Sequence, residues 1–425
     1  FKLNVFNVFV STTCLFVMLR RSSTCAASIR PFHTVLGIET SCDDTAVSIV
    51  TSDRRILASR RVNDRATLAS LGGICPGLVA KQHRAFLPSL IEECLHSVRL
   101  RAADLSAVAV STRPGLVIAL KEGVSAAIDL CRLHRIPLVP VHHMRAHALV
   151  SSLCHPHLQY PFVALLVSGG HSLVALVRSA DHFELIVDSV TGSAGECLDK
   201  VGRELDLDCS VDHPGAALEK AAARAPIGSH LSMEIPGVAS SKDASFDFAS
   251  LKSSLLGQLR KRKQLGEEID VEKLAAAAQH HTARHLCSRL HSSLQFLTLE
   301  GSIREGTSLV MAGGVASNNY LRCCVEKVCS LHGLRLLRLP PSLCTDNGEM
   351  IAWTGLRMIE ERSLSIIPWE EIPSSLYVHA REEIGRNRTG EVPSKTKMMI
   401  KASSIHADSN PLVVHSTEDY RFRVF

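Results

Sequence analysis

The sequence lacks three kinds of pattern that would assign it to a common class. None of its 14 cysteines form a CxxC pair, so zinc fingers and thioredoxin-like redox motifs are excluded. After the amino-terminal region, no segment reaches the roughly 18–20 unbroken apolar residues of a membrane span. The HExxH motif of zinc proteases is also absent. These absences favour a globular protein whose cysteines are small, reduced thiols.

Acidic residues are absent from the beginning of the chain, where Glu39 is the first. Four basic residues and many Ser and Thr precede it, which is the composition of a mitochondrial transit segment. We predict this segment over residues 1–33, with translation starting at Met18 and residues 1–17 as untranslated upstream sequence. The alternative, a secretory or membrane-anchored protein, fits poorly with the missing disulfide pattern. Because the leader carries four of the five excess positive charges, the net charge of +5 is no evidence for a nucleic-acid partner.

Two segments of the chain resemble one another. Residues 35–62 and 162–190 both read as strand, small polar turn, strand, charged turn and strand. The 425 residues exceed one typical domain, and 46% apolar with 21% charged residues is an ordinary globular composition. We therefore predict a duplicated α/β fold with mixed sheets and helices on both faces. We place the first domain at 34–142, the second, with inserted helices, at 143–380, and a mobile tail at 381–425.

Three small polar turns are candidates for binding phosphate. They lie at residues 41–44, 168–170 and 313–314, each at the end of an apolar run. Successive backbone N–H groups in such turns form an anion cradle. One Gly-Gly turn alone is usually an ordinary turn, but three at related places in a duplicated fold favour nucleotide binding.

Two histidines and one aspartate are candidate metal ligands. His143 and His147 are four residues apart, which places both imidazoles on one face of a helix. The alternative is a buried or solvated histidine pair. Asp346 precedes Asn-Gly and a helical pattern, so it reads either as a third ligand or as a helix N-cap.

Charged residues elsewhere have plainer interpretations. Glu196, Asp199 and Lys200 follow a glycine turn and read as a solvated helix face. The basic run at 260–263 either contacts phosphate or is solvated.

Nine motifs occur in order between about residue 35 and residue 357. They are GIETSCDDTAVSIV, GGICPGLVAKQH, RPGLVIALKEG, PVHHMRAHAL, FVALLVSGGHSLV, GECLDK, SFDFASLKSSL, MAGGVASNN and LCTDNGEMIAW. Together they resemble the motifs of the tRNA threonylcarbamoyladenosine transferases of the Kae/TsaD type. The leader and the ECLDK form of one motif resemble the mitochondrial branch.

The resemblance implies an actin-like, sugar-kinase-like (ribonuclease H-like) double domain. It implies transfer of a threonylcarbamoyl group from threonylcarbamoyl-AMP to the N6 amine of the adenine 3′ to the anticodon, in mitochondrial tRNAs that read ANN codons. It further implies a homodimer in the mitochondrial matrix with no membrane association, supplied by a threonylcarbamoyl-AMP synthase. One divalent cation per subunit, zinc or iron, is expected.

The resemblance also implies roles for individual residues. Asp43 and Asp44 match a pair that acts near the reacting centre, and the metal ligands fall on His143, His147 and Asp346. The residues that match the family's substrate-binding positions are Leu166, Val167, Ser168, Gly169, Gly170, Asp199, Gly215, Glu219 and Asn318.

The sequence departs from the family pattern at three places. Arg145 replaces the usual Glu between the metal histidines, and an inward side chain there would weaken metal binding. Arg113 stands where a Gly is typical. The family's YPGG-type loop is represented only by residues 213–216, and on this loop we align Gly215 and Glu219 to the ribose-contacting positions.

Three other functions compete with acyl transfer. An ATP-dependent small-molecule kinase of the same fold would lack the HxxxH pattern, which is present here with CTDN. A metalloprotease of the O-sialoglycoprotein endopeptidase type would be expected to carry HExxH. A non-catalytic actin-like assembly or nucleotide-sensing protein would need no metal site.

Overall fold

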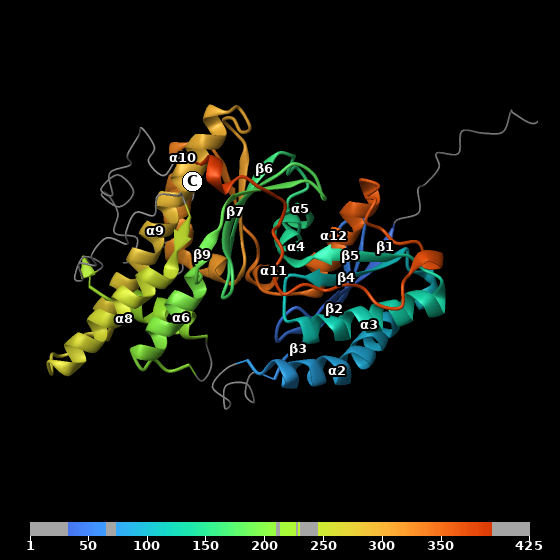
Figure 1. The fold of residues 1–425 in the computed structure, drawn as a ribbon, viewed down its shortest axis with the longest axis horizontal. Helices are drawn as coiled ribbons and strands as arrows, with labels where there is room; N and C mark the ends of the chain where they lie inside the picture. Colours follow the sequence, from blue (N-terminus) through green and yellow to red (C-terminus); the bar gives the residue numbers. More distant parts are fainter. Residues whose placement is uncertain (1–32, 65–73, 210–212, 227, 230–244, 393–425) are drawn as a thin grey trace, which may run out of the picture. The chain divides into compact units, whose positions relative to one another are not determined.

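The computed structural model describes residues 33–64, 74–209, 213–226, 228–229 and 245–392 (Figure 1). Within these residues, two mixed β-sheets and the helices packed on them form the buried core. No helix in these ranges has both the length and the hydropathy needed to cross a bilayer. The predicted leader, apart from its last residue, and positions 393–425 of the predicted tail lie outside the described residues.

The first sheet has the strand order β3-β2-β1-β4-β5. β1 pairs antiparallel with β2 and parallel with β4, β2 pairs antiparallel with β3, and β4 pairs parallel with β5. The strands are β1 Thr34–Glu39, β2 Thr45–Thr51, β3 Ile56–Val62, β4 Ala107–Arg113 and β5 Leu138–His142.

The second sheet repeats this order and these directions as β8-β7-β6-β11-β12, with a short strand β13 added beside β8. The repetition confirms the predicted duplication, and the arrangement is the predicted actin-like, sugar-kinase-like fold. The strands are β6 Phe162–Val167, β7 Ser172–Val177, β8 Phe183–Val187, β11 Ser308–Ala312, β12 Arg335–Leu337 and β13 Arg386–Asn387. A separate parallel pair is formed by β9 Ser189–Thr191 and β10 Phe246–Asp247.

Helices cover both faces of the first sheet. α2 (Pro76–Ser97) and α3 (Val117–His134) pack on one face, and α12 (Gly348–Glu360) packs on β1, β2 and β4 from the other. Successive residues of a strand point to opposite faces, so Leu36 belongs to the core under α2 and α3 whereas Val35 belongs to the larger core shared with α12. Gly37 lets α12 approach β1 closely, because a Cβ there would lie 2.3 Å from the backbone N of Ala352.

The second sheet packs mainly against the longer helices inserted between its strands. The buried face of α9 contributes to its core, and α10 and α7 pack on α9. The helices of this half are α4 His143–Leu149, α5 Ser151–Cys154, α6 Ala194–Glu204, α7 Pro214–Arg224, α8 Phe248–Gln264, α9 Val271–Leu299, α10 Asn319–Leu331 and α11 Pro341–Cys344, with 3₁₀ turns at η3 Gly314–Ser317 and η5 Thr389–Glu391. Two further 3₁₀ turns, η1 Ala102–Asp104 and η4 Trp369–Glu371, lie beside the first sheet.

Two elements differ from a simple division into consecutive domains. α12 lies inside the range predicted for the second domain but packs on the first sheet, so the chain returns to that sheet near its end. The domain bounds 34–142 and 143–380 stay predictions. Residues 381–392 fall in the predicted mobile tail, but β13 within them pairs with β8.

Candidate functional site

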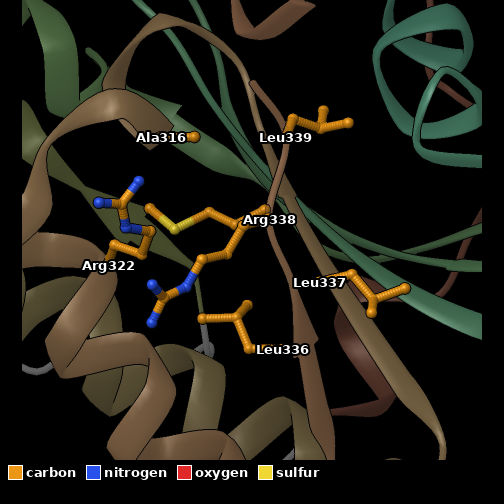
Figure 2. A pocket seen from close by; sticks show the side chains of 7 residues that line it. Ala316, Arg322, Leu336, Leu337, Arg338 and Leu339 are labelled. Atoms are coloured by element: carbon orange, nitrogen blue, oxygen red, sulfur yellow. The ribbon is translucent and has the colours of Figure 1, made fainter. Parts of the chain in front are cut away.

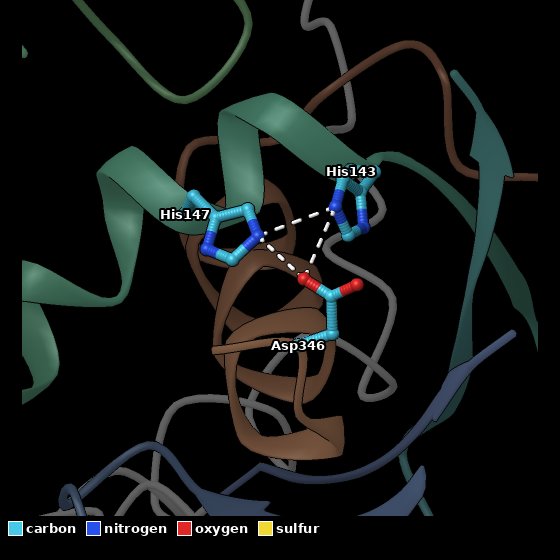
Figure 3. Close-up of side chains that lie close together, drawn as sticks. All are labelled: His143, His147 and Asp346. Atoms are coloured by element: carbon cyan, nitrogen blue, oxygen red, sulfur yellow. Dashed lines mark hydrogen bonds and ion pairs between the residues drawn. The ribbon is translucent and has the colours of Figure 1, made fainter. Parts of the chain in front are cut away.

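Two buried imidazoles and one carboxylate meet at the start of α4 (Figure 3). α4 begins where β5 ends, and its 3.6-residue period places His143 and His147 on one face. Their Nε2 atoms are 3.2 Å apart. Oδ1 of Asp346 lies 3.0 Å from Nε2 of His147 and 3.5 Å from Nε2 of His143. The structure therefore brings together the three predicted ligands, which are separated by up to 203 positions in the sequence.

The loop that carries Asp346 is fixed from both sides. Asn347 is the N-cap of α12, and its side chain accepts a hydrogen bond of 2.8 Å from the backbone N of Met350. The guanidinium of Arg61 on β3 donates to the backbone carbonyl of Asp346 at 3.2 Å and to the hydroxyl of Thr345 at 2.7 Å. The capping role considered for Asp346 thus belongs to Asn347, and the Asp346 carboxylate is left to face the imidazoles.

The spacing of the three ligand atoms fits a single metal ion. Nitrogen and oxygen ligands about 2.0–2.1 Å from a tetrahedral zinc ion lie about 3.3 Å from one another. The observed separations are 3.2, 3.0 and 3.5 Å. Among the described residues, this is the one group of three or more His, Cys, Asp or Glu side chains with such spacing. Two His and one carboxylate are donors that suit zinc and iron.

Charges inside the cluster are strongly coupled. Burial lowers the pKa of His143, but the carboxylates of Glu39 and Asp346 outweigh it and raise the pKa to about 9. Burial raises the pKa of the Asp346 carboxyl, and the imidazoles of His143 and His147 overcome this and hold it well below its usual range. The metal-free site therefore favours a carboxylate beside a protonated ring, and a cation can replace that proton.

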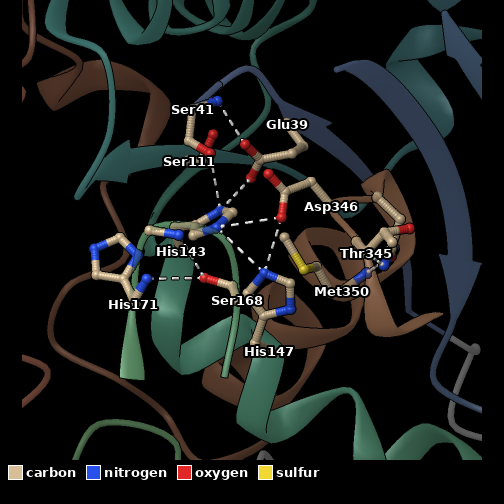
Figure 4. A network of polar contacts seen from close by, with 12 residues as sticks. Glu39, Ser41, Ser111, His143, His147, Ser168, His171, Thr345, Asp346 and Met350 are labelled. Atoms are coloured by element: carbon tan, nitrogen blue, oxygen red, sulfur yellow. Dashed lines mark hydrogen bonds and ion pairs between the residues drawn. The ribbon is translucent and has the colours of Figure 1, made fainter. Parts of the chain in front are cut away.

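A further carboxylate lies behind the cluster, and sequence reasoning missed it (Figure 4). Glu39 ends β1 with no exposed surface, and its Oε2 lies 3.0 Å from Nδ1 of His143. Its Oε1 accepts a hydrogen bond of 2.5 Å from the backbone N of Ser41. The signal in the sequence was an acidic residue at the end of an otherwise apolar strand.

The hairpin turn that follows β1 carries the two predicted catalytic carboxylates. Asp43 is half-buried, whereas Asp44 is buried and its Oδ1 accepts a hydrogen bond of 2.6 Å from the side chain of Asn63. Burial raises the pKa of Asp44 to about 6. Nε2 of the buried His83 lies 2.9 Å from the carbonyl of Cys42, which fixes the turn to α2. A carboxyl with this pKa is mostly ionised at neutral pH and is suited to accepting a proton.

The equivalent turn of the second sheet carries the predicted anion cradle. The hydroxyl oxygen of Ser168 accepts hydrogen bonds from the backbone N atoms of Gly170, at 3.3 Å, and His171, at 3.0 Å. A Cβ on Gly169 or Gly170 would meet no atom within 4 Å, so this face of the turn is open. Gly195 of α6 packs against the turn, because a Cβ there would lie 2.6 Å from the Ser168 carbonyl oxygen.

His171 follows this turn, beside Ser168, and was also missed by sequence reasoning (Figure 4). Burial, followed by the charges of His143 and His147, lowers the pKa of His171 to about 4. Its ring is therefore neutral at physiological pH and adds no charge to the cluster.

The predicted ribose-contacting residues form hydrogen bonds with neighbouring elements. Oδ1 of Asp199 on α6 accepts a bond of 2.8 Å from the backbone N of Gly215 at the start of α7. Oε1 of Glu219 accepts a bond of 2.7 Å from the backbone N of Asn319. Burial raises the pKa of Glu219. α6, α7 and the start of α10 are thus joined around one region beside the Ser168 turn.

The remaining predicted substrate-binding residues offer fewer free side-chain atoms. Asn318 is buried and caps α10 by accepting a bond of 3.0 Å from the backbone N of Leu321, and its amide donates to Gln279 at 3.0 Å. Leu166 and Val167 end β6 with fully buried side chains. These two residues therefore present only backbone atoms to a ligand.

The two arginines that depart from the family pattern face away from the cluster. Arg145 donates from Nε to the carbonyl of Ile384 at 2.7 Å, and its guanidinium lies 5.3 Å from the ring centre of Phe183. Arg113 forms a salt bridge of 2.8 Å with Glu382. Both arginines therefore hold the segment after α12, and Arg145 does not place its charge among the metal ligands.

The basic run at 260–263 is largely neutralised by neighbouring acids. Arg260 bonds to Glu204 at 3.0 Å, and Lys263 lies 3.2 Å from Asp206. Arg262 is 3.9 Å from Glu267. These pairs make the run a weaker candidate for phosphate contacts than its sequence indicates.

A shallow pocket with almost no enclosed volume lies between β11, η3, α10 and β12 (Figure 2). Two guanidinium groups line it, and both have partners: Arg322 donates to Asn319, and Arg338 forms a salt bridge of 2.5 Å with Glu326. The pocket therefore offers little free positive charge to a ligand.

Comparisons with known proteins give a consistent result. The sequence matches the family model of TsaD, tRNA N6-adenosine threonylcarbamoyltransferase, over residues 55–353. A Caenorhabditis elegans protein named probable tRNA N6-adenosine threonylcarbamoyltransferase, mitochondrial, is 44% identical over 398 residues, covering 92% of this chain and 91% of the relative. The human protein named tRNA N6-adenosine threonylcarbamoyltransferase, mitochondrial, is 35% identical over 338 residues, covering 76% of this chain and 80% of the relative. The solved structure of T. kodakarensis HypF is similar in fold alone, with a TM-score of 0.53 and 14% identity over 78% of this chain and 48% of that one.

Proposed function

Because the chain belongs to the TsaD family of tRNA N6-adenosine threonylcarbamoyltransferases, we propose that it transfers the threonylcarbamoyl group from threonylcarbamoyl-AMP to tRNA. The acceptor is the N6 amine of the adenine 3′ to the anticodon in tRNAs that read ANN codons. The observation that carries the proposal is the convergence of His143, His147 and Asp346 beside the turns at 41–44 and 168–170. A kinase or a protease would not require this combination.

Residues of both turns would act on the substrate. The hydroxyl oxygen of Ser168 accepts two backbone N–H groups, so its own hydrogen is free to be donated to the phosphate of the acyl-adenylate. A Cβ on Gly169 or Gly170 would meet no atom within 4 Å, so the phosphate can approach the backbone of the turn closely. Holding the acyl-adenylate in this way aligns its carbonyl with the incoming amine, which supplies rate by positioning.

The chemical step exchanges one bond for another. The N6 nitrogen forms a bond to the carbamoyl carbon, the bond from that carbon to the phosphate oxygen breaks, and AMP leaves. The amine proton passes to a carboxylate, for which Asp44 is the better candidate because its pKa of about 6 lies near the working pH. Asp43, which is less buried, would assist by binding or orienting the amine.

A divalent cation held by His143, His147 and Asp346 supplies Lewis acidity toward substrate oxygens. We propose one such ion per subunit, zinc or iron, because two imidazoles and one carboxylate leave coordination positions for substrate. Measuring the metal content of purified protein by mass spectrometry tests this. A wild-type protein that retained neither ion after reconstitution would contradict it.

The cellular setting follows from the relatives. Curated relatives from worm and human are named mitochondrial, and we propose the mitochondrial matrix for this chain. We further propose a homodimer that receives its substrate from a threonylcarbamoyl-AMP synthase. Light scattering of the purified protein tests the dimer, and a monomer at micromolar concentration would exclude it.

The decisive experiment is a transfer assay. The purified chain, a threonylcarbamoyl-AMP synthase, ATP, bicarbonate and labelled threonine are incubated with an ANN-reading tRNA. We expect label in the tRNA, and none in a matched tRNA with guanine in place of the target adenine. A parallel reaction with ATP and candidate sugars tests the kinase alternative. Phosphorylated sugar without labelled tRNA would refute the proposed function.

A further inference from the structure

Glu39 is a buried carboxylate that has no Arg or Lys partner within the described part of the chain. It has no exposed surface, and among the described residues its one ion-pair partner is His143. Taking a carboxylate out of water is costly unless hydrogen bonds and charges compensate it. The structure gives Glu39 two such contacts, the backbone N of Ser41 at 2.5 Å and Nδ1 of His143 at 3.0 Å.

These contacts determine which nitrogen of His143 carries a proton. An ionised carboxylate only accepts hydrogen bonds, so Nδ1 of His143 must donate to Oε2 of Glu39. In the neutral ring the other nitrogen, Nε2, then carries the lone pair. That atom is the one that faces His147 at 3.2 Å and Asp346 at 3.5 Å.

The second histidine of the cluster has no equivalent support. Nδ1 of His147 is buried and has no hydrogen-bond partner among the described residues. Within the part of the chain that the structure describes, only the ring of His143 among the two histidines is therefore oriented by a hydrogen bond at Nδ1, and Glu39 is the carboxylate that accepts it. The hydroxyl of Ser41, 3.1 Å from the same Nδ1, could stabilise the opposite tautomer if it donated to that nitrogen.

We propose that Glu39 is a positioning residue that fixes His143 in the Nδ1–H tautomer and so presents the Nε2 lone pair to the metal. The proposal rests on the metal site of the proposed function. The same carboxylate bonds the backbone at Ser41, so it also joins the metal helix to the turn that carries Asp43 and Asp44. The buried Glu39 side chain thus fixes the position of the metal helix relative to the turn that carries the two aspartates.

The test compares metal affinity in two variants. In Glu39→Gln the amide keeps the volume and hydrogen-bonding capacity of the side chain, but its NH₂ group can donate to Nδ1 and turn Nε2 into an N–H. Loss of such an outer partner typically lowers metal affinity about 10–100-fold. In Ser41→Ala the hydroxyl 3.1 Å from the same nitrogen is lost and the carboxylate stays, so we expect a smaller loss of zinc affinity than in Glu39→Gln.

Zinc affinity is measured by competition with a chromophoric chelator, and cobalt absorption reports ligand geometry. We expect a zinc complex weaker by about 10–100-fold and an altered cobalt spectrum for Glu39→Gln, with circular dichroism unchanged. Equal affinities of wild type and Glu39→Gln would refute the role of Glu39 and leave the metal site intact. A wild-type protein that binds no zinc would refute both.

A measurement on the wild-type protein covers the case in which the variant does not fold. Two-bond proton–nitrogen correlations of ¹⁵N-histidine-labelled, zinc-bound protein identify the protonated ring nitrogen of His143. We expect the proton on Nδ1 and the metal on Nε2. The opposite assignment would overturn the proposal whatever the variants do.

Discussion

Replacing Asp44 with Asn should make the protein more stable and much less active. The pKa of the Asp44 carboxyl rises from its ordinary value of 3.8 to about 6 in the folded protein, chiefly because of burial. A pKa difference of about 2 corresponds to about 3 kcal/mol of differential free energy between the two protonation states. The Asn63 side chain can still donate to the amide oxygen of the variant, so the hydrogen bond of 2.6 Å need not be lost.

The sign of the pH dependence follows from proton binding. Between about pH 4 and pH 6 the native state holds a proton on Asp44 that the unfolded chain has released, so the free energy of unfolding falls as pH rises through this range. Below about pH 4 the Asp44 carboxyl is protonated in both states, so the free-energy cost of burying its charge is absent. The amide of the variant never ionises, and Asp44→Asn should therefore match wild type at about pH 4 and exceed it by up to about 3 kcal/mol at about pH 7.5.

Urea unfolding of metal-stripped wild type and Asp44→Asn at about pH 4 and about pH 7.5 measures this difference. Removing the metal avoids a nearby cation that would itself stabilise the carboxylate. The transfer assay on reconstituted protein should show a rate lowered about 10²–10⁴-fold if Asp44 is the base. A stability difference that is the same at both pH values would refute the reasoning from burial. A full transfer rate would remove Asp44 as the base.

Three further substitutions test other parts of the structure. Arg145→Ala should leave zinc affinity within about threefold of wild type and lower the free energy of unfolding by about 1–3 kcal/mol, because the Arg145 side chain supports the segment after α12 rather than the metal. Chelator competition measures the zinc affinity, and urea unfolding measures the stability. Arg388→Ala should lower the free energy of unfolding by about 1.5–3 kcal/mol, because Glu184 loses its 2.6 Å partner but keeps Arg178 at 2.5 Å, and an unchanged free energy in urea unfolding would contradict this. Gly195→Ala should displace the turn at Ser168 and weaken the binding of a non-hydrolysable acyl-adenylate analogue, measured by calorimetry, at least about tenfold. Gly257→Ala is the control, because a Cβ there meets no atom within 4 Å, and it should leave the affinity for the analogue unchanged.

Local patterns in the sequence were enough to predict the duplicated fold and to mark the three residues of the cluster as candidates, and the resemblance to a known family selected them as metal ligands. Strand periodicity identified both copies, and the spacing of His143 and His147 determines their common face on any helix. Glu39 was not recognised because its role depends on a ring 104 positions away. The direction of the Arg145 side chain likewise depends on the backbone of Ile384, which no local pattern specifies.

The segment after α12 also limits how far the two halves can move. Ile367 bridges to Leu138 at the edge of the first sheet, and β13 joins the edge of the second. Between the carbonyl that Arg145 holds, at Ile384, and β13 there is only one residue, a span of a few ångströms even when fully extended. The metal helix is therefore mechanically coupled to the second sheet. Because α4 also continues directly from β5, the helix that carries His143 and His147 is connected to both sheets, and a rotation of one sheet relative to the other would strain this helix.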